Sequence, residues 1–330
     1  MQYSIKEEAN FLNENLVQNV MNNRGLPLLT EERGVGASRE YLDIVKAVVD
    51  YVADTIKYGN TFNGKKECVL KIPQSICKRF DRFSSLEIKV TVKDIGELSK
   101  IHTGGGHINI PLFTGVYKDK LSMPVVIYLS SFSNGNTLER RTVAEPLIHE
   151  LNHARDTFER LNGAGCSYNP SSPVAQAEAY HIIEKKVSPQ IGQIIYRLFS
   201  SSEVNALISS VYGDLASINS KREYFKDHIR LTGAYNIYLQ LLDIVKMIEE
   251  DPNDFQEDFE TLIQMFATDY RLDCLNPMPH CRRHPDIATF RKAFVEKAYK
   301  SLNAILRGIG RVASYYYDVT EEGSNPATIE

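Results

Sequence analysis

The sequence predicts an α+β fold in which a small mixed sheet packs on a central helix and a mostly helical part follows. Alternating apolar and polar residues over 86–92 indicate a half-buried strand, and the continuously apolar run 124–130 indicates a central one. Beyond residue 187, apolar residues recur at three- and four-residue steps, which is typical of amphipathic helices. This change of period places the sheet before the helical part.

The chain divides into two predicted units and a tail. Residues 1–136 hold N-terminal helices and the sheet, 137–318 hold the remaining helices, and 319–330 form an acidic tail that we expect to be flexible. The predicted strands are 67–72, 86–92, 107–113 and 124–130. The predicted helices are 5–20, 38–58, one beginning near Pro146, one beginning at Pro173, and further ones near 190–219, 234–250, 254–269 and 285–308.

Composition excludes several classes of protein. The 38 lysines and arginines are outnumbered by 42 aspartates and glutamates, so the net charge is −4 and nucleic-acid binding is not expected. The longest apolar run, 124–129, is far shorter than the roughly 20 residues of a membrane-spanning helix. The start of the chain lacks the apolar core of a signal peptide, and the five cysteines have irregular spacing. We expect a cytoplasmic protein with reduced thiols, or one exported without a cleaved signal, such as an effector; the oligomeric state stays open.

One segment carries a metal-binding pattern. It reads His149-Glu150-Leu151-Asn152-His153, which has the form His-Glu-x-x-His. Residues four apart lie on one face of a helix, so both imidazoles can reach a single Zn²⁺ ion. Glu150 is placed beside this pair, where its carboxylate can hold a metal-bound water as general base rather than ligate the metal.

Catalytic zinc usually has three protein ligands, so a third is needed. We expect it to be Glu178, on the helix that follows, where small alanines allow close packing and a buried carboxylate requires a partner. Glu184 is the second candidate. Asp156 is the third, although its place one turn beyond His153 suits an outer partner of that histidine better.

These residues resemble the gluzincin branch of the zincin metallopeptidases, over residues 142–184. The stretch from His149 to Ala154 is most similar to clostridial neurotoxin light chains and to zinc-protease effectors of bacteria. The Asn-Glu pair of thermolysin-like enzymes is absent, because Ala177 precedes Glu178. An Arg-x-x-Tyr of the neurotoxin kind is also absent, since Arg311 and Tyr315 are one position too far apart.

The resemblance implies a zincin-like fold and a zinc-dependent endopeptidase acting on a peptide or protein substrate. His149, His153 and Glu178 would hold zinc, and Glu150 would take a proton from the metal-bound water and pass it to the leaving amine. A further donor would hold the developing oxyanion; we consider His181 for this role, with a core or surface position as its alternative. The resemblance also implies an edge strand that pairs with the substrate, for which 107–110 is the candidate beside a plain glycine-rich loop.

Two further possibilities stay open. Cys274, His280, Cys281 and His284 are a second group of potential metal ligands, but their spacing matches no common zinc site and favours a structural loop. The chain as a whole could instead be a helical interaction protein whose His-Glu-x-x-His is structural or inactive, or a zinc hydrolase with a non-peptide substrate. Metal content and the effect of changing Glu150 separate these functions.

Overall fold

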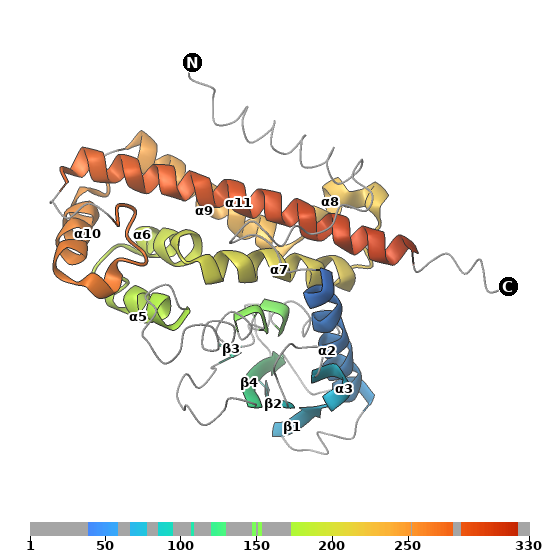
Figure 1. Cartoon of the computed structure of the whole chain (residues 1–330). Coiled ribbons are helices and arrows are strands. Elements are labelled where there is room, and N and C mark those ends of the chain that lie inside the picture. Colours follow the sequence, from blue (N-terminus) through green and yellow to red (C-terminus); the bar gives the residue numbers. More distant parts are fainter. Residues whose placement is uncertain are drawn as a thin grey trace.

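The sheet is small, mixed and four-stranded, and the rest of the described chain is mostly helical (Figure 1). The computed structural model describes residues 39–58, 67–77, 85–94, 107–108, 120–129, 147–149, 151–153, 173–251, 253–279 and 285–322. The helix expected over 5–20 lies outside these ranges. Within them, every helix is too short or too polar to cross a membrane.

The four strands are β1 (Glu67–Ile72), β2 (Ser85–Asp94), β3 (His107–Ile108) and β4 (Lys120–Leu129), in the order β1-β2-β4-β3. β2 and β4 are parallel, and the outer strands pair antiparallel to them. The apolar run of β4 was expected to be central, and this is confirmed: Val125 pairs with Val90 of β2 on one side and with Ile108 of β3 on the other. Of the strand predicted over 107–113, the described part is β3, an edge strand.

Helix α2 (Arg39–Tyr58) follows the apolar pattern that predicted it. Val45, Val48 and Val52 are at most 1% exposed, because they lie on the face that packs inward. The Tyr51 hydroxyl donates to the carbonyl of Lys71 in β1 at 3.1 Å, which ties the helix to the sheet. Pro73 ends β1 as expected, and the short helix α3 (Gln74–Cys77) follows.

The helical part contains α5 (Pro173–Ile183), α6 (Pro189–Ile194), the π-helical turn η2 (Ile195–Phe199), α7 (Ser201–Ser217), the 3-10 turn η3 (Arg222–Tyr224), α8 (Phe225–Ile229), α9 (Gly233–Glu250), α10 (Gln256–Thr268), the 3-10 turn η4 (Tyr270–Leu272) and α11 (Ile287–Glu322). The long α11 runs beside α7 and α9 (Figure 1). The single helix expected over 190–219 is wrong, since Ser200 has an extended backbone and separates η2 from α7.

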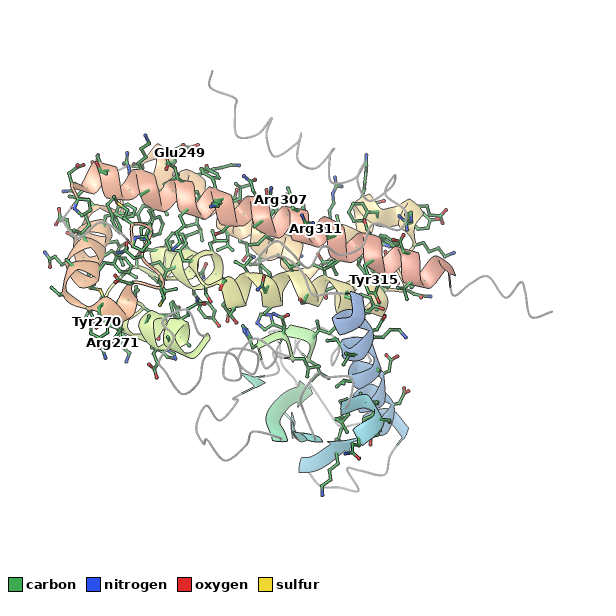
Figure 2. All side chains as sticks on the ribbon, viewed as in Figure 1. Glu249, Tyr270, Arg271, Arg307, Arg311 and Tyr315 are labelled. Atoms are coloured by element: carbon green, nitrogen blue, oxygen red, sulfur yellow. The ribbon has the colours of Figure 1, made fainter. Side chains whose placement is uncertain are left out.

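The last helix is longer than predicted. We expected it to end near residue 308, but Tyr315, Tyr316 and Tyr317 are at most 5% exposed and continue the buried face to the end of α11. Its final turn includes residues 319–322, which were expected to belong to the flexible tail. The Tyr315 hydroxyl donates to the Asp43 carboxylate, so this bond joins α11 to α2; Figure 2 labels Tyr315.

Candidate metal centre

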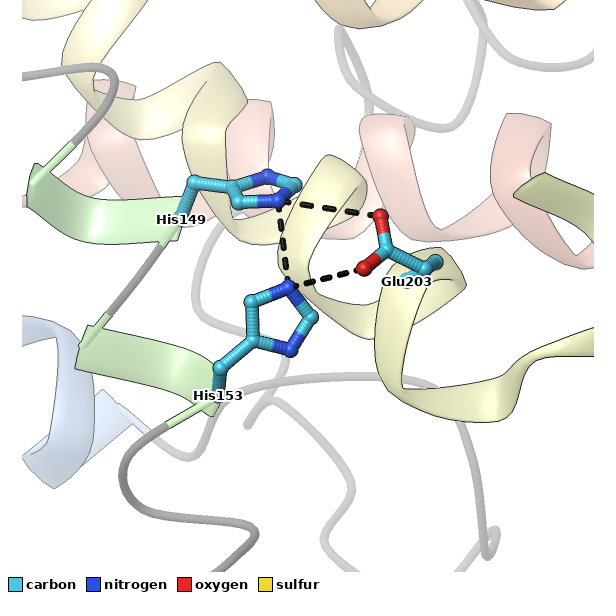
Figure 3. A group of neighbouring side chains, drawn as sticks. All are labelled: His149, His153 and Glu203. Atoms are coloured by element: carbon cyan, nitrogen blue, oxygen red, sulfur yellow. Dashed lines mark hydrogen bonds and ion pairs between the residues drawn. The ribbon is translucent and has the colours of Figure 1, made fainter. Parts of the chain in front are cut away.

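His149 and His153 face each other on one side of a buried helical segment, formed by 147–149 and 151–153. Leu147, Ile148 and Leu151 are at most 1% exposed and anchor this segment in the core. The two imidazole rings meet edge to face with their centroids 4.8 Å apart, and their Nε2 atoms are separated by 3.2 Å (Figure 3). The two Nε2 atoms therefore point to one place.

The third member of the cluster is Glu203, in the first turn of α7. Its Oε1 lies 3.1 Å from Nε2 of His153, and its Oε2 lies 3.8 Å from Nε2 of His149 (Figure 3). The Glu203 side chain is 8% exposed. Desolvating a carboxylate to this degree is costly unless opposite charges, donors or a metal ion surround it.

The break in the chain at Ser200 places Glu203 at a helix start. The Ser200 hydroxyl accepts from the amide of Glu203 at 3.4 Å, which caps α7. The same hydroxyl donates to Oε1 of Gln176 in α5 at 2.8 Å, and both side chains are buried. Because the cap is tied to a neighbouring helix, the first turn of α7 has a fixed position beside the histidines.

Two further side chains complete the surroundings of the cluster. Nδ1 of His153 lies 2.7 Å from the Ser202 hydroxyl, so the serine contacts the ring nitrogen that faces away from the centre. Nη1 of Arg197, in η2, donates to Oε2 of Glu203 at 3.2 Å. Ser202 orients the His153 ring, whose Nε2 faces the centre, and Arg197 orients the Glu203 carboxylate, whose Oε1 lies near that Nε2. Partners around metal ligands usually have this role.

The electrostatics favour the ligating protonation states of His149 and Glu203. Burial, aided by His153 and Arg197 and opposed by Glu203, lowers the pKa of His149 from 6.5 to about 3, so its imidazole is neutral at pH 7. Burial alone would raise the pKa of Glu203, but the hydrogen bond and charge of His153, with His149 and Arg197, outweigh it and lower the pKa to about 2. A neutral imidazole and an ionised carboxylate are the forms that ligate divalent cations.

The donor atoms also have a suitable spacing. One ligand atom from each of His149, His153 and Glu203 can be chosen so that all lie within 4.8 Å of one another. Zinc-ligand bonds of about 2.0–2.2 Å in a tetrahedron separate neighbouring ligand atoms by roughly 3.3 Å. The 3.2 Å between the two Nε2 atoms and the 3.1 Å to Oε1 are close to that separation. Two of the separations are therefore those of a zinc site, the His149 contact to Oε2 is longer at 3.8 Å, and two imidazoles with a carboxylate are a donor set that zinc takes.

The third ligand expected from the sequence does not join this cluster. Ala175 and Ala179 are buried as anticipated, but the Glu178 side chain on α5 is exposed. The carboxylate that approaches the two histidines is that of Glu203 instead. Glu184, the second candidate, instead contacts Nδ1 of His181 at 2.6 Å.

Other predicted site residues have different positions. The His181 side chain is 69% exposed and pairs with Glu184, so it is a surface histidine in this structure. Glu150 and Asp156 lie outside the described residues, as do His280, Cys281 and His284 of the second group. Cys274 is described; it is a free, partly buried thiol that contacts the Ala175 carbonyl at 4.0 Å.

Sequence reasoning missed Glu203, although a signal for its position exists. Residues 200–203 read Ser-Ser-Ser-Glu, the form of a capping box, and this pattern predicts a new helix start at Ser200. The capping box alone is enough to explain a glutamate at position 203, so the sequence gives no reason to assign it to a metal. A role toward the histidines becomes visible only when α7 is placed against them.

Comparison with known proteins finds no matching family model, no similar curated protein and no similar solved structure. The His149, His153 and Glu203 cluster therefore stands on the geometry of this chain alone.

Proposed function

We propose that this chain is a zinc-dependent metallopeptidase of the zincin type, with His149, His153 and Glu203 as its metal ligands and Glu150 as its general base. The observation that carries the proposal is the approach of Glu203 to within 3.1 Å of a His-Glu-x-x-His imidazole. The carboxylate comes from a separate helix and is buried there, where an unpaired charge would be destabilising. Two histidines from one helix and a glutamate from another are the ligand set of the gluzincins.

The fold gives further support to the zincin type. The segment of His149 and His153 is buried, a mixed sheet precedes it in the chain, and helices that include α7 follow. Among the described strands, β3 lies at the edge of this sheet and pairs antiparallel to β4, so its other side has no described partner and is the candidate pairing edge. An extended peptide that adds to such an edge receives backbone hydrogen bonds, which hold it straight beside the site.

The chain's own groups have complementary roles in this proposal. His149 is neutral and Glu203 is ionised at pH 7, so neither must exchange a proton before it ligates. When bound, zinc supplies a Lewis acid and brings the pKa of a water ligand to about 7. Glu150, adjacent to His149 in the sequence, would accept a proton on its carboxylate and donate it to the leaving amine. Cys274 is a free thiol, which suits a reducing compartment.

Metal content and proteolysis test the proposal together. Purified protein should contain about one zinc per chain, and wild type should cut peptides in a proteome-wide cleavage screen. Glu150→Gln should retain zinc and lose the cleavage, because it removes only the proton acceptor. Glu178→Gln, at an exposed position, should change neither. Absence of bound metal after zinc loading would refute the proposal, whereas bound zinc without any peptide cleavage would point to a non-peptide substrate.

A further inference from the structure

We propose that Arg197 is a positioning residue that holds one oxygen of Glu203, so that the other oxygen alone faces the metal. This inference rests on the metal centre proposed above and assigns to it a coordination mode. A carboxylate can ligate through one oxygen or through both, and the two modes give different coordination numbers. Arg197 would select ligation through one oxygen.

The two oxygens of Glu203 have different partners. Oε1 lies 3.1 Å from Nε2 of His153, whereas Oε2 accepts a hydrogen bond from Nη1 of Arg197 at 3.2 Å. Oε2 also approaches His149, but at 3.8 Å from its Nε2 this contact is longer than the one between Oε1 and His153. A charge-assisted hydrogen bond is stronger than a neutral one and fixes the plane of the carboxylate. Rotation of Glu203 to present both oxygens would require this bond to break.

Arg197 is held in place from the other side. Its guanidinium lies over the ring of Tyr196, 4.9 Å from the ring centroid, and the Tyr196 ring packs on Tyr180 of α5 at 4.5 Å between centroids. These contacts connect α5, η2 and the first turn of α7. A guanidinium stacked on an aromatic ring loses less freedom when it forms a hydrogen bond.

The backbone at Arg197 is unusual as well. Arg197 is the central residue of η2, a π-helical turn, and a π-turn changes the direction of side chains relative to a continuous α-helix. Such turns occur often at functional sites. Here the turn comes directly before the cap of α7 and carries the residue that contacts Glu203.

Zinc affinity and a cobalt spectrum test this role. We would compare wild type with Arg197→Gln and Arg197→Lys, measuring zinc binding by competition with a chromogenic chelator and recording the visible absorption of the Co²⁺-loaded proteins. Arg197→Gln should weaken zinc binding by about 10- to 100-fold, the usual loss when an outer partner of a ligand is removed. Its Co²⁺ absorption should become weaker, since a second carboxylate oxygen raises the coordination number. Arg197→Lys keeps the charge without the planar fork and should be intermediate.

Arg222→Gln is the matched control. Arg222, in η3, also forms a partly buried ion pair, with Asp318 of α11 at 2.5 Å. This pair is not at the metal centre. Arg222→Gln should lower thermal stability, but its zinc affinity and cobalt spectrum should equal those of wild type. Circular dichroism checks that each variant is folded, and Arg197→Lys serves as the test if Arg197→Gln does not fold.

The outcomes separate this inference from the proposed function. Wild-type affinity and an unchanged cobalt spectrum in the folded Arg197 variants would overturn the role of Arg197 and leave the metal centre intact. Failure of wild type itself to bind Zn²⁺ or Co²⁺ would overturn both. A loss of affinity equal to that of Arg222→Gln would show a general effect on stability and also overturn the role.

Discussion

His153 and Ser202 are joined by a 2.7 Å contact between the imidazole Nδ1 and the serine hydroxyl. The next residue along the chain, Glu203, contacts the other ring nitrogen of the same histidine at 3.1 Å. Two consecutive residues in the first turn of α7 thus hold both nitrogens of one imidazole. Because Ser202 is 2% exposed, water does not compete for this hydrogen bond. α7 therefore sets the orientation of His153 as well as supplying the carboxylate.

Ser202→Ala should weaken zinc binding by about 10-fold, at the low end of the losses known for outer partners of histidine ligands. Without the hydroxyl, the ring loses the partner that keeps its Nε2 lone pair directed at the centre. Ser210→Ala is the matched control, because Ser210 is equally buried in α7 but donates to the Leu207 carbonyl. Chelator competition measures both affinities. Equal affinities for the two variants would contradict a role of Ser202 at His153.

Glu203→Gln should reduce zinc affinity by at least about 100-fold, more than the loss of an outer partner, because it replaces an anionic ligand with a neutral amide. Glu178→Gln should bind zinc like wild type, since its side chain is exposed on α5. Isothermal titration of metal-free protein with Zn²⁺ measures both. The reverse result, with loss only in Glu178→Gln, would restore the ligand set expected from the sequence.

Local patterns predicted much of the fold. The alternation over 86–92 and the apolar run over 124–130 correspond to β2 and β4, and Pro73 and Pro173 mark the element boundaries expected of them. The break at Ser200 was missed because the apolar period continues through η2 into α7, so periodicity alone shows one helix. The length of α11 was missed because its last buried residues are tyrosines. Tyrosine is found both in cores and at surfaces, so its type alone does not indicate a buried helix face.

The candidate site was likewise predicted only in part. His149 and His153 were predicted because a spacing of four is a local property of a helix. Glu203 comes from a helix whose approach depends on packing, such as the buried bond from Ser200 to Gln176 of α5, and no local pattern contains that information. Glu178 was chosen from its alanine neighbours, but Ala175 and Ala179 are buried while the Glu178 side chain is exposed.

Lys297 should make the protein more stable at alkaline pH. Burial lowers the pKa of Lys297 from 10.5 to about 8, with an opposing contribution from Cys274. Between these two values the unfolded chain binds a proton that the folded chain does not, so the free energy of unfolding rises with pH from about 8 to 10.5. The rise is at most about 3.5 kcal/mol, since each pKa unit corresponds to about 1.4 kcal/mol. Below pH 8 the buried charge remains a cost.

Urea unfolding as a function of pH measures this effect. Lys297→Met should lack the rise, although it also loses the hydrogen bonds from Nζ to the carbonyls of Leu275 and Asn276, at 3.3 and 3.0 Å. Lys300→Met, which removes an exposed lysine from the same helix, should keep the rise. A rise of the same size in Lys297→Met would show that other groups cause it.

Gly308 should be essential for the packing of α11 on α7. A Cβ atom at this position would lie 2.5 Å from Cδ1 of Ile208 and 2.8 Å from its Cγ1 and Cγ2, closer than such atoms can approach. Alanine is favoured over glycine in a helix by about 1 kcal/mol. Overpacking a core costs about 1–3 kcal/mol, so the net effect of Gly308→Ala should be a loss of stability.

Two comparisons isolate this steric effect in urea unfolding. Gly192→Ala places a Cβ no closer than 3.9 Å to its neighbours and should be neutral or stabilising by up to about 1 kcal/mol. Ile208→Ala removes the atoms that clash, so its combination with Gly308→Ala should lose less stability than the sum of the single changes. Strict additivity in this double-mutant cycle would show that the two helices can separate to accept the methyl group, and that Gly308 does not set their distance.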